Sequence, residues 1–375
     1  MYDLKAEIAR TLKAWNTGNP VGPAMLEFYP TQKCNLRCRT CIQPQSYDKN
    51  DFELPDEEFV RIIEEAIELG TRIFHIGGGG EPFYRRELVL KLMRMIKEKG
   101  RHGALTSNTT LLQKSDLEMI VKIGWDDVHF SIDGPDPETC DYLRGAGTFR
   151  KAVQALQWLN EYKREYNKKD PFLILNFVIS NKNFRSIPDY IRFAGENQAG
   201  YIFFNHMIMH SSSFKYLQLS EEDKKSLTDI IREAQELSDK LKLDTNLSEI
   251  VSATKSMSGE GEKTGGLSRK ILSRLRFFKP KISRARNKGS LKNAYCLKPW
   301  YHLVLQTSGK VGPCCIFQNP RVNLYKHSLK EIWIEKYFSD LRRAMTARQP
   351  PPECSNCPPV MREEVAGLAE LLPDN

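Results

Sequence analysis

Residues 25–41 read MLEFYPTQKCNLRCRTC and carry the strongest signal in the chain. The apolar start, Met25–Tyr29, is a candidate strand that runs directly into three cysteines in a CxxxCxxC arrangement: Cys34, Cys38 and Cys41. Three soft thiolates so close together can bind one face of an iron-sulfur cube and leave the fourth iron without a protein ligand. A structural zinc site is the alternative, but it needs a fourth nearby Cys or His, and none follows before His75. We interpret the motif as an iron-sulfur site with an open iron.

Helical and extended patterns alternate along the chain after this motif. For example, residues 55–70 are apolar at 59, 62, 63, 66 and 69 and stop at a glycine, as expected for a helix packed on a sheet. We predict further helices over 87–99, 114–123, 149–167 and 186–194, and strands over 74–76, 103–107, 127–132, 172–179 and 201–204. Six or seven β-α units with short loops require an α/β fold with a parallel sheet, either open or curved into a partial barrel. The loops after the strands should carry the chemistry.

The pattern also predicts how the chain is divided. A long amphipathic helix is predicted over 220–243, and residues 253–292 are rich in Ser, Gly, Lys and Arg. We predict five parts: an N-terminal helix (1–23), the α/β core (24–215), a connecting helix (216–250), a basic flexible insertion (251–293) and a second cysteine-bearing unit (294–375).

Composition and cysteine usage narrow the class of protein. The chain has 375 residues, 40% of them hydrophobic and 27% charged, which is typical of a globular protein and excludes a collagen-like or wholly disordered chain. No stretch of about 18 uncharged apolar residues occurs, and the first residues mix acidic and basic side chains, so we expect a cytoplasmic protein. The nine cysteines are odd in number and clustered, which favours metal ligation over a disulfide framework.

The net charge of +9 is concentrated in one segment. Residues 251–295 hold twelve Lys or Arg against two Glu, so the rest of the chain is close to neutral. Within this segment, residues 267–288 interleave Leu, Ile and Phe with Lys and Arg. A solvated surface insertion, contact with an anionic membrane and contact with an acidic substrate all remain open. Nucleic-acid binding is disfavoured, because no aromatic stacking platform or known module accompanies the charge.

Beyond the cysteines, the sequence resembles the radical SAM superfamily, in which a CxxxCxxC cluster binds S-adenosylmethionine. The glycine run IGGGGEP at 76–82 is similar to the family's motif for the methionine amino group. The resemblance therefore implies a partial (β/α)6 barrel of the radical SAM type. It also implies a set of cofactor-binding residues: Gly79, Gly80, Glu81, Ser107, Asn108, Ser131, Asp133 and Asn176. One departure is Thr40, where the family often has an aromatic residue, so the adenine contact is expected to differ.

A second group of four cysteines lies near the C-terminus: Cys296, Cys314, Cys354 and Cys357. Their order, with a hairpin predicted at Ser308-Gly309 and a helix before the last pair, resembles the single-cluster Twitch form of the SPASM domain. The resemblance implies a small α+β domain whose four cysteines bind an auxiliary 4Fe-4S cluster. A four-cysteine zinc site is the alternative, because CxxC suits zinc equally well.

Two cysteines, Cys140 and Cys315, belong to neither group, and Arg144 is a further candidate site residue. Cys140 could donate a hydrogen atom to a substrate radical, although a free cysteine is more often buried and inert. Cys315 could replace Cys314 as a ligand. Arg144 could hold an anionic substrate group, but a surface helix start is the favoured interpretation.

The resemblance implies an enzyme that cleaves S-adenosylmethionine to a 5′-deoxyadenosyl radical. That radical would abstract hydrogen from a small metabolite, sugar, lipid or peptide precursor. Oxidation, epimerisation and carbon-bond formation remain open as reaction types, and flavodoxin or ferredoxin is the expected reductant. The stretch before the first strand is too short for the peptide-recognition domain that many peptide-modifying relatives carry, which modestly disfavours a peptide substrate. A non-catalytic iron-sulfur or zinc scaffold, or an electron carrier, is the alternative function.

Overall fold

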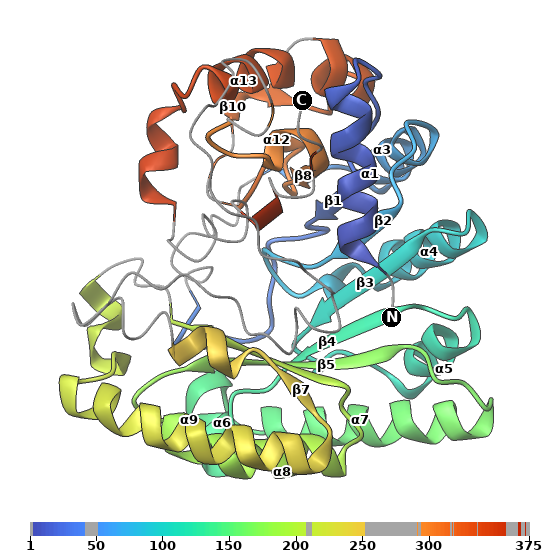
Figure 1. Cartoon of the computed structure of the whole chain (residues 1–375). Coiled ribbons are helices and arrows are strands. Elements are labelled where there is room, and N and C mark those ends of the chain that lie inside the picture. Colours follow the sequence, from blue (N-terminus) through green and yellow to red (C-terminus); the bar gives the residue numbers. More distant parts are fainter. Residues whose placement is uncertain are drawn as a thin grey trace. The chain divides into compact units, whose positions relative to one another are not determined.

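A computed structural model describes residues 3–41, 52–207, 212–251, 291, 294–315, 317, 319–335, 337–357, 367–368 and 372. The chain divides into two compact units, which are described separately (Figure 1). The first unit comprises Met1–Lys33, Tyr47–Leu105 and Ser283–Asn375. The second unit comprises Cys34–Ser46 and Thr106–Ile282.

The first unit is built on a sheet whose central strands are parallel. Its strand order is β10-β9-β8-β1-β2-β3, with the last two residues of β3 belonging to the second unit. The strands are β1 (Met25–Phe28), β2 (Ile73–Ile76), β3 (His102–Ser107), β8 (His302–Leu305), β9 (Lys310–Gly312) and β10 (Asn319–Asn323). Strand β8 pairs in parallel with β1, which places His302 opposite Met25. The C-terminal cysteine-bearing segment therefore extends the same sheet as the N-terminal strand.

Two of the longer helices of the first unit, α3 (Asp56–Glu68) and α4 (Arg86–Glu98), each bury one apolar face. The described helical elements are α1 (Leu4–Asn16), α3 (Asp56–Glu68), η1 (Pro82–Arg85), α4 (Arg86–Glu98), α12 (Lys298–Tyr301), η5 (Glu331–Glu335), α13 (Tyr337–Thr346) and η6 (Pro352–Asn356). In α3, Phe59, Ile62 and Ile63 are fully buried, following the spacing read from the sequence. The Asp3 side chain caps α1 by accepting a hydrogen bond from the backbone N–H of Ala6.

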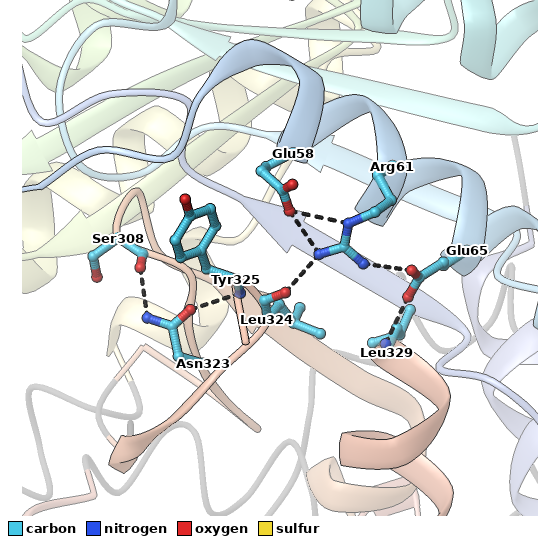
Figure 2. Close-up of polar contacts among 8 residues, drawn as sticks. All are labelled: Glu58, Arg61, Glu65, Ser308, Asn323, Leu324, Tyr325 and Leu329. Atoms are coloured by element: carbon cyan, nitrogen blue, oxygen red, sulfur yellow. Dashed lines mark hydrogen bonds and ion pairs between the residues drawn. The ribbon is translucent and has the colours of Figure 1, made fainter. Parts of the chain in front are cut away.

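Polar contacts join α3 to the C-terminal segment within the first unit (Figure 2). The Arg61 guanidinium donates to the carbonyl oxygen of Leu324 over 2.6 Å and also pairs with Glu58 and Glu65. The second carboxylate oxygen of Glu65 accepts from the backbone N–H of Leu329 over 2.6 Å. These contacts fix the segment after β10 against the core helix.

The second unit contains the remaining parallel strands and their helices. Its strand order is β4-β5-β6-β7, and helices lie along one face of these strands (Figure 1). The strands are β4 (Asp127–Ser131), β5 (Phe172–Ile179), β6 (Tyr201–His206) and β7 (Asp244–Thr245). The described helical elements are α5 (Lys114–Lys122), α6 (Pro137–Arg144), α7 (Thr148–Glu165), η2 (Phe184–Ser186), α8 (Ile187–Glu196), η3 (Ser212–Leu217) and α9 (Glu221–Leu241). Alternate residues of β5 are buried, so its other face carries the half-buried side chains.

Most predicted elements are present within one to three residues of their predicted bounds. The features that were not predicted include helix α6, whose eight residues follow a polar turn, and the pairing of β8 with β1. The predicted hairpin is confirmed, because β8 and β9 are antiparallel and Gly309 turns between them with φ +84°. The five-part division stays a prediction. The basic insertion 251–293 lies outside the described residues except at Val251 and Leu291. No helix of the described residues is both long and apolar enough to cross a membrane.

Candidate functional site

The CxxxCxxC loop opens the second unit. The thiol of Cys38 donates to the carbonyl oxygen of Arg144 over 3.8 Å, and the backbone N–H of Cys41 donates to the Cys38 carbonyl over 3.1 Å. Burial raises the pKa of Cys38 to about 11, and the Asp133 carboxylate and the thiols of Cys41 and Cys34 add to that rise against the opposing effect of Arg144. The three thiols therefore lie within electrostatic reach of one another, which is the donor set that an iron-sulfur cluster needs.

Asparagine side chains hold this loop in place. The amide of Asn108 donates to the Cys34 sulfur over 3.7 Å and to the side-chain oxygen of Asn35 over 3.1 Å. Asn35 in turn donates to the hydroxyl of Thr110 over 2.7 Å. Ser107, also predicted as cofactor-binding, is buried, and its hydroxyl accepts from the backbone N–H of Thr109. Asn108 thus contacts the cysteine loop directly, whereas Ser107 holds the turn that follows β3.

Asp133 and Arg144 form a buried ion pair at the ends of β4 and α6. The Arg144 Nη1 atom lies 2.8 Å from Asp133 Oδ2, with side-chain exposures of 11% and 0%. The second Asp133 oxygen accepts from the backbone N–H of Val178 over 2.8 Å, and its carbonyl accepts from Asn183. Burial by itself would lower the pKa of Arg144, but Asp133 and the thiols of Cys38 and Cys140 raise it, so the guanidinium stays charged.

The expected surface position of Arg144 is therefore wrong. The residue ends α6 instead of starting a helix, and its charge is buried because Asp133 compensates it. Sequence reasoning missed the pair because its members are eleven positions apart and belong to different elements. The sequence signal that could have found it is an acid just after a strand followed by Arg-Gly at a helix end.

Ser131 and Asn176 lie side by side on neighbouring strands. They are register partners on β4 and β5, on the half-buried face of the sheet. Among the described residues, the side-chain oxygen of Asn176 and the Nε atom of Arg144 are buried without a hydrogen-bond partner. Buried polar atoms of this kind are normally satisfied, so both positions suit the polar groups of a bound ligand.

The glycine run lies in the first unit. Gly78 and Gly79 have φ of +64° and +47°, a backbone region that favours glycine. A Cβ atom on Gly80 would lie 2.0 Å from the carbonyl oxygen of Lys33, so no side chain fits there. Glu81 is buried, and its backbone N–H donates to the same carbonyl over 2.8 Å. The run packs closely on the residues that precede Cys34 in the chain.

The second cysteine group also lies in the first unit. Burial raises the pKa of Cys296 to about 12, and the thiols of Cys314 and Cys354 add to the rise. The Cys314 sulfur accepts from the backbone N–H of Phe317 over 3.4 Å. Cys357 closes a turn on the Cys354 carbonyl over 3.2 Å. All four candidate donors are cysteine sulfurs, the ligand type that binds iron-sulfur clusters.

The two remaining cysteines differ in their surroundings. Cys315 is exposed, yet its sulfur is desolvated, which raises its pKa to about 11 together with the Cys314 thiol and the Glu27 carboxylate. Cys140 is fully buried, and burial raises its pKa to about 12. This burial favours a packing role, and the hydrogen-donor role stays a prediction. All nine cysteines are free of disulfide bonds. No three Cys, His, Asp or Glu side chains of the described ranges are arranged to hold a single metal ion.

Comparisons with known proteins agree with these sites. Residues 28–194 match the radical SAM superfamily, and residues 296–358 match SPASM, an iron-sulfur cluster-binding domain. The chain is 31% identical over 159 residues to the PqqA peptide cyclase of Granulibacter bethesdensis, covering 42% of this chain and 40% of that protein. It is 28% identical over 206 residues to the Fe-coproporphyrin III synthase of Methanosarcina barkeri, covering 54% and 49%. The chain thus spans about half the length of the curated relatives it matches, or less.

Solved structures show the same fold. SuiB of Streptococcus suis bound to S-adenosylmethionine has a TM-score of 0.62 at 17% identity, covering 91% of this chain and 72% of that chain. SuiB bound to the precursor peptide SuiA also gives 0.62, at 16% identity, covering 95% and 74%. These similarities confirm an α/β fold with a parallel sheet of the partial-barrel type.

The matches identify a radical SAM domain at residues 28–194 and a SPASM domain at residues 296–358. These domains imply a 4Fe-4S cluster, S-adenosylmethionine and auxiliary iron-sulfur ligation, and the two cysteine groups described above supply sulfur donors of the kind that such clusters take.

Proposed function

We propose that the chain is a radical enzyme that cleaves S-adenosylmethionine reductively and abstracts a hydrogen atom from its substrate. When bound, the first cluster and S-adenosylmethionine would supply a 5′-deoxyadenosyl radical, and the auxiliary cluster would exchange an electron with the substrate. This proposal rests on the buried polar side chains near the cysteine loop. A loop that only held a metal would have no need of the buried guanidinium of Arg144 or of the unpartnered oxygen of Asn176.

Different residues of the second unit would bind different groups of S-adenosylmethionine. Arg144, charged and buried, would hold the carboxylate of the methionine group. Asp133 positions Arg144, since both of its oxygens are already engaged within the protein. The oxygen of Asn176 would accept a hydrogen bond from a ribose hydroxyl, with Ser131 beside it. Asn108 keeps Cys34 oriented.

The glycine run would bind the methionine amino group. Positive φ angles at Gly78 and Gly79 turn backbone carbonyls to positions that a substituted residue would not allow. Glu81 would supply the counter-charge for the ammonium group. These roles follow from the resemblance and from the local geometry of the run.

A peptide precursor is the substrate class we propose. The support comes from relatives whose names specify peptides, the PqqA peptide cyclase and SuiB with SuiA. A relative named for Fe-coproporphyrin III synthesis shows that similar chains also carry names with other substrates. Oxidation, epimerisation and carbon-bond formation stay open as reaction types. A flavodoxin or ferredoxin is the proposed reductant.

Anaerobic reconstitution tests the proposal against the scaffold alternative. Iron and sulfide are counted per chain, and 5′-deoxyadenosine is assayed after addition of dithionite and S-adenosylmethionine. About eight irons per chain with cleavage are expected. Replacing Cys34, Cys38 and Cys41 with Ala should abolish cleavage and remove about four irons. Bound zinc, or full iron loading without cleavage, would support the scaffold.

A further inference from the structure

A buried histidine of the first unit contacts the loop that carries the auxiliary-cluster cysteine Cys314. His302 lies on β8 and is 6% exposed. Its Nδ1 atom lies 3.0 Å from the carbonyl oxygen of Pro313, the residue directly before Cys314. Its Nε2 atom lies 3.5 Å from a carboxylate oxygen of Glu27 on β1. One ring therefore links the cysteine loop to an acid on the neighbouring strand.

The pairing of β1 with β8 creates this link. His302 is the register partner of Met25, and Glu27 is two residues further along β1, so both side chains lie on the same face of the sheet. This contact crosses more than 270 positions of sequence. It depends on the C-terminal segment adding a strand beside β1.

Both partners of the ring are hydrogen-bond acceptors. A carbonyl oxygen only accepts hydrogen bonds, so Nδ1 facing Pro313 is placed as a donor. The Glu27 carboxylate, 3.5 Å from Nε2, also accepts, so the two side chains are placed to form an ion pair when the ring is protonated. Burial alone would raise the pKa of Glu27, but the hydrogen bond from His302, the nearby His75 and the Tyr29 hydroxyl lower it to about 2. Glu27 therefore carries a negative charge beside the buried histidine ring.

Both side chains lie near the cysteine pair. The Glu27 carboxylate contributes to the raised pKa of Cys315, and Tyr29, which donates to Glu27, is influenced by the thiols of both Cys314 and Cys315. Charges and hydrogen bonds around sulfur ligands set the reduction potential of an iron-sulfur cluster, because they stabilise its oxidised and reduced forms unequally.

We propose that Glu27 and His302 form an ion pair that holds the Cys314 loop and sets the reduction potential of the auxiliary cluster. His302 is a positioning residue, acting on the cluster through the Pro313 carbonyl and through its charge. This inference rests on the proposed function in one respect, that Cys314 and its partner cysteines bind a cluster. It adds that Glu27, on strand β1, influences the reduction potential of that cluster.

The test isolates the auxiliary cluster in the full-length chain. Cys34, Cys38 and Cys41 are replaced with Ala, so that a redox titration followed by electron paramagnetic resonance reports the second cluster alone. In this background His302→Gln retains a donor for the Pro313 carbonyl but removes the cation, so the midpoint potential should fall. Glu27→Gln removes the anion and leaves the cation, so the potential should rise.

A matched control separates this effect from general loss of a His–Glu pair. His327 and Glu331 form such a pair in the same unit, with Nδ1 to oxygen at 3.2 Å and a histidine side chain 42% exposed. His327→Gln should leave the potential unchanged. Opposite shifts for the two test variants support the inference. Unchanged potentials, or shifts of the same sign, overturn it.

Two further outcomes are also decisive. Absence of any iron-sulfur signal in the Cys34, Cys38 and Cys41 background refutes the cluster assignment itself, and the inference falls with it. If His302→Gln loses the cluster that the background retains, the loop-holding part is supported, and the direction of the Glu27→Gln shift alone decides the part that concerns potential.

Discussion

The Asp133–Arg144 pair gives the sharpest prediction, because each member is buried and depends on the other. We consider Asp133→Asn, Arg144→Gln and the double variant. Each single change leaves one buried charge uncompensated, which should lower the free energy of unfolding by about 3 to 5 kcal/mol. The double variant leaves no stranded charge and loses mainly hydrogen bonds, at a cost of about 1 to 3 kcal/mol. The single effects should therefore sum to well above the effect of the double variant, with a coupling of about 3 kcal/mol or more.

Backbone hydrogen exchange in β5 measures this loss of stability in the region of the pair. The backbone N–H of Val178 donates to Asp133, so peptides spanning Phe172–Ile179 report on the pair. A loss of about 3 kcal/mol in a single variant corresponds to roughly a hundredfold faster exchange where local opening is at equilibrium. Peptides covering β2, in the first unit, should exchange as in the parent protein. Arg144→Gln should also raise the KM for S-adenosylmethionine, because it removes the group proposed to hold the carboxylate.

Additive effects would refute this reasoning. If the double variant exchanges as fast as the sum of the single variants requires, the two charges do not compensate each other. If neither single variant changes exchange in β5, the pair has no role in holding the end of β4 against the neighbouring strand.

The remaining predictions concern three other sites. Gly80→Ala should abolish formation of 5′-deoxyadenosine, because its Cβ would lie 2.0 Å from the Lys33 carbonyl oxygen, whereas Gly100→Ala, with no atom within 4 Å, should cost only about 1 kcal/mol in thermal unfolding. Glu27 has its pKa lowered from 4.5 to about 2, so its contribution of about 3 kcal/mol is present above pH 4.5 and is lost as the pH falls toward 2. Urea unfolding of cluster-free protein should therefore show a flatter decline in acid for Glu27→Gln. Cys140→Ala should lower stability by about 1 kcal/mol and retain product formation; cleavage of S-adenosylmethionine without product would instead support the hydrogen-donor role.

Local patterns in the sequence predicted most of the helices and strands and drew attention to the two cysteine groups. Periodicity over about ten residues predicts each helix and strand, because burial of one face repeats at the spacing of the element. The spacing of Cys34, Cys38 and Cys41 predicts a cluster because all three donors lie on one short loop. The glycine run was found through its resemblance to a family motif, and the structure adds that Gly80 lies against the backbone of Lys33, one position before Cys34. Helix α6 escaped prediction because it has only eight residues and follows a polar turn.

Contacts between distant segments were decided by the tertiary structure. The sequence placed Arg144 on the surface, whereas the fold buries it, because the acid that compensates its charge lies at the end of another element. The sequence likewise did not reveal that β8 pairs with β1, which brings His302 to Glu27. A single sequence contains no period or spacing that records such pairings. Which charges become buried together depends on which strands become neighbours, and only packing of the whole chain determines that.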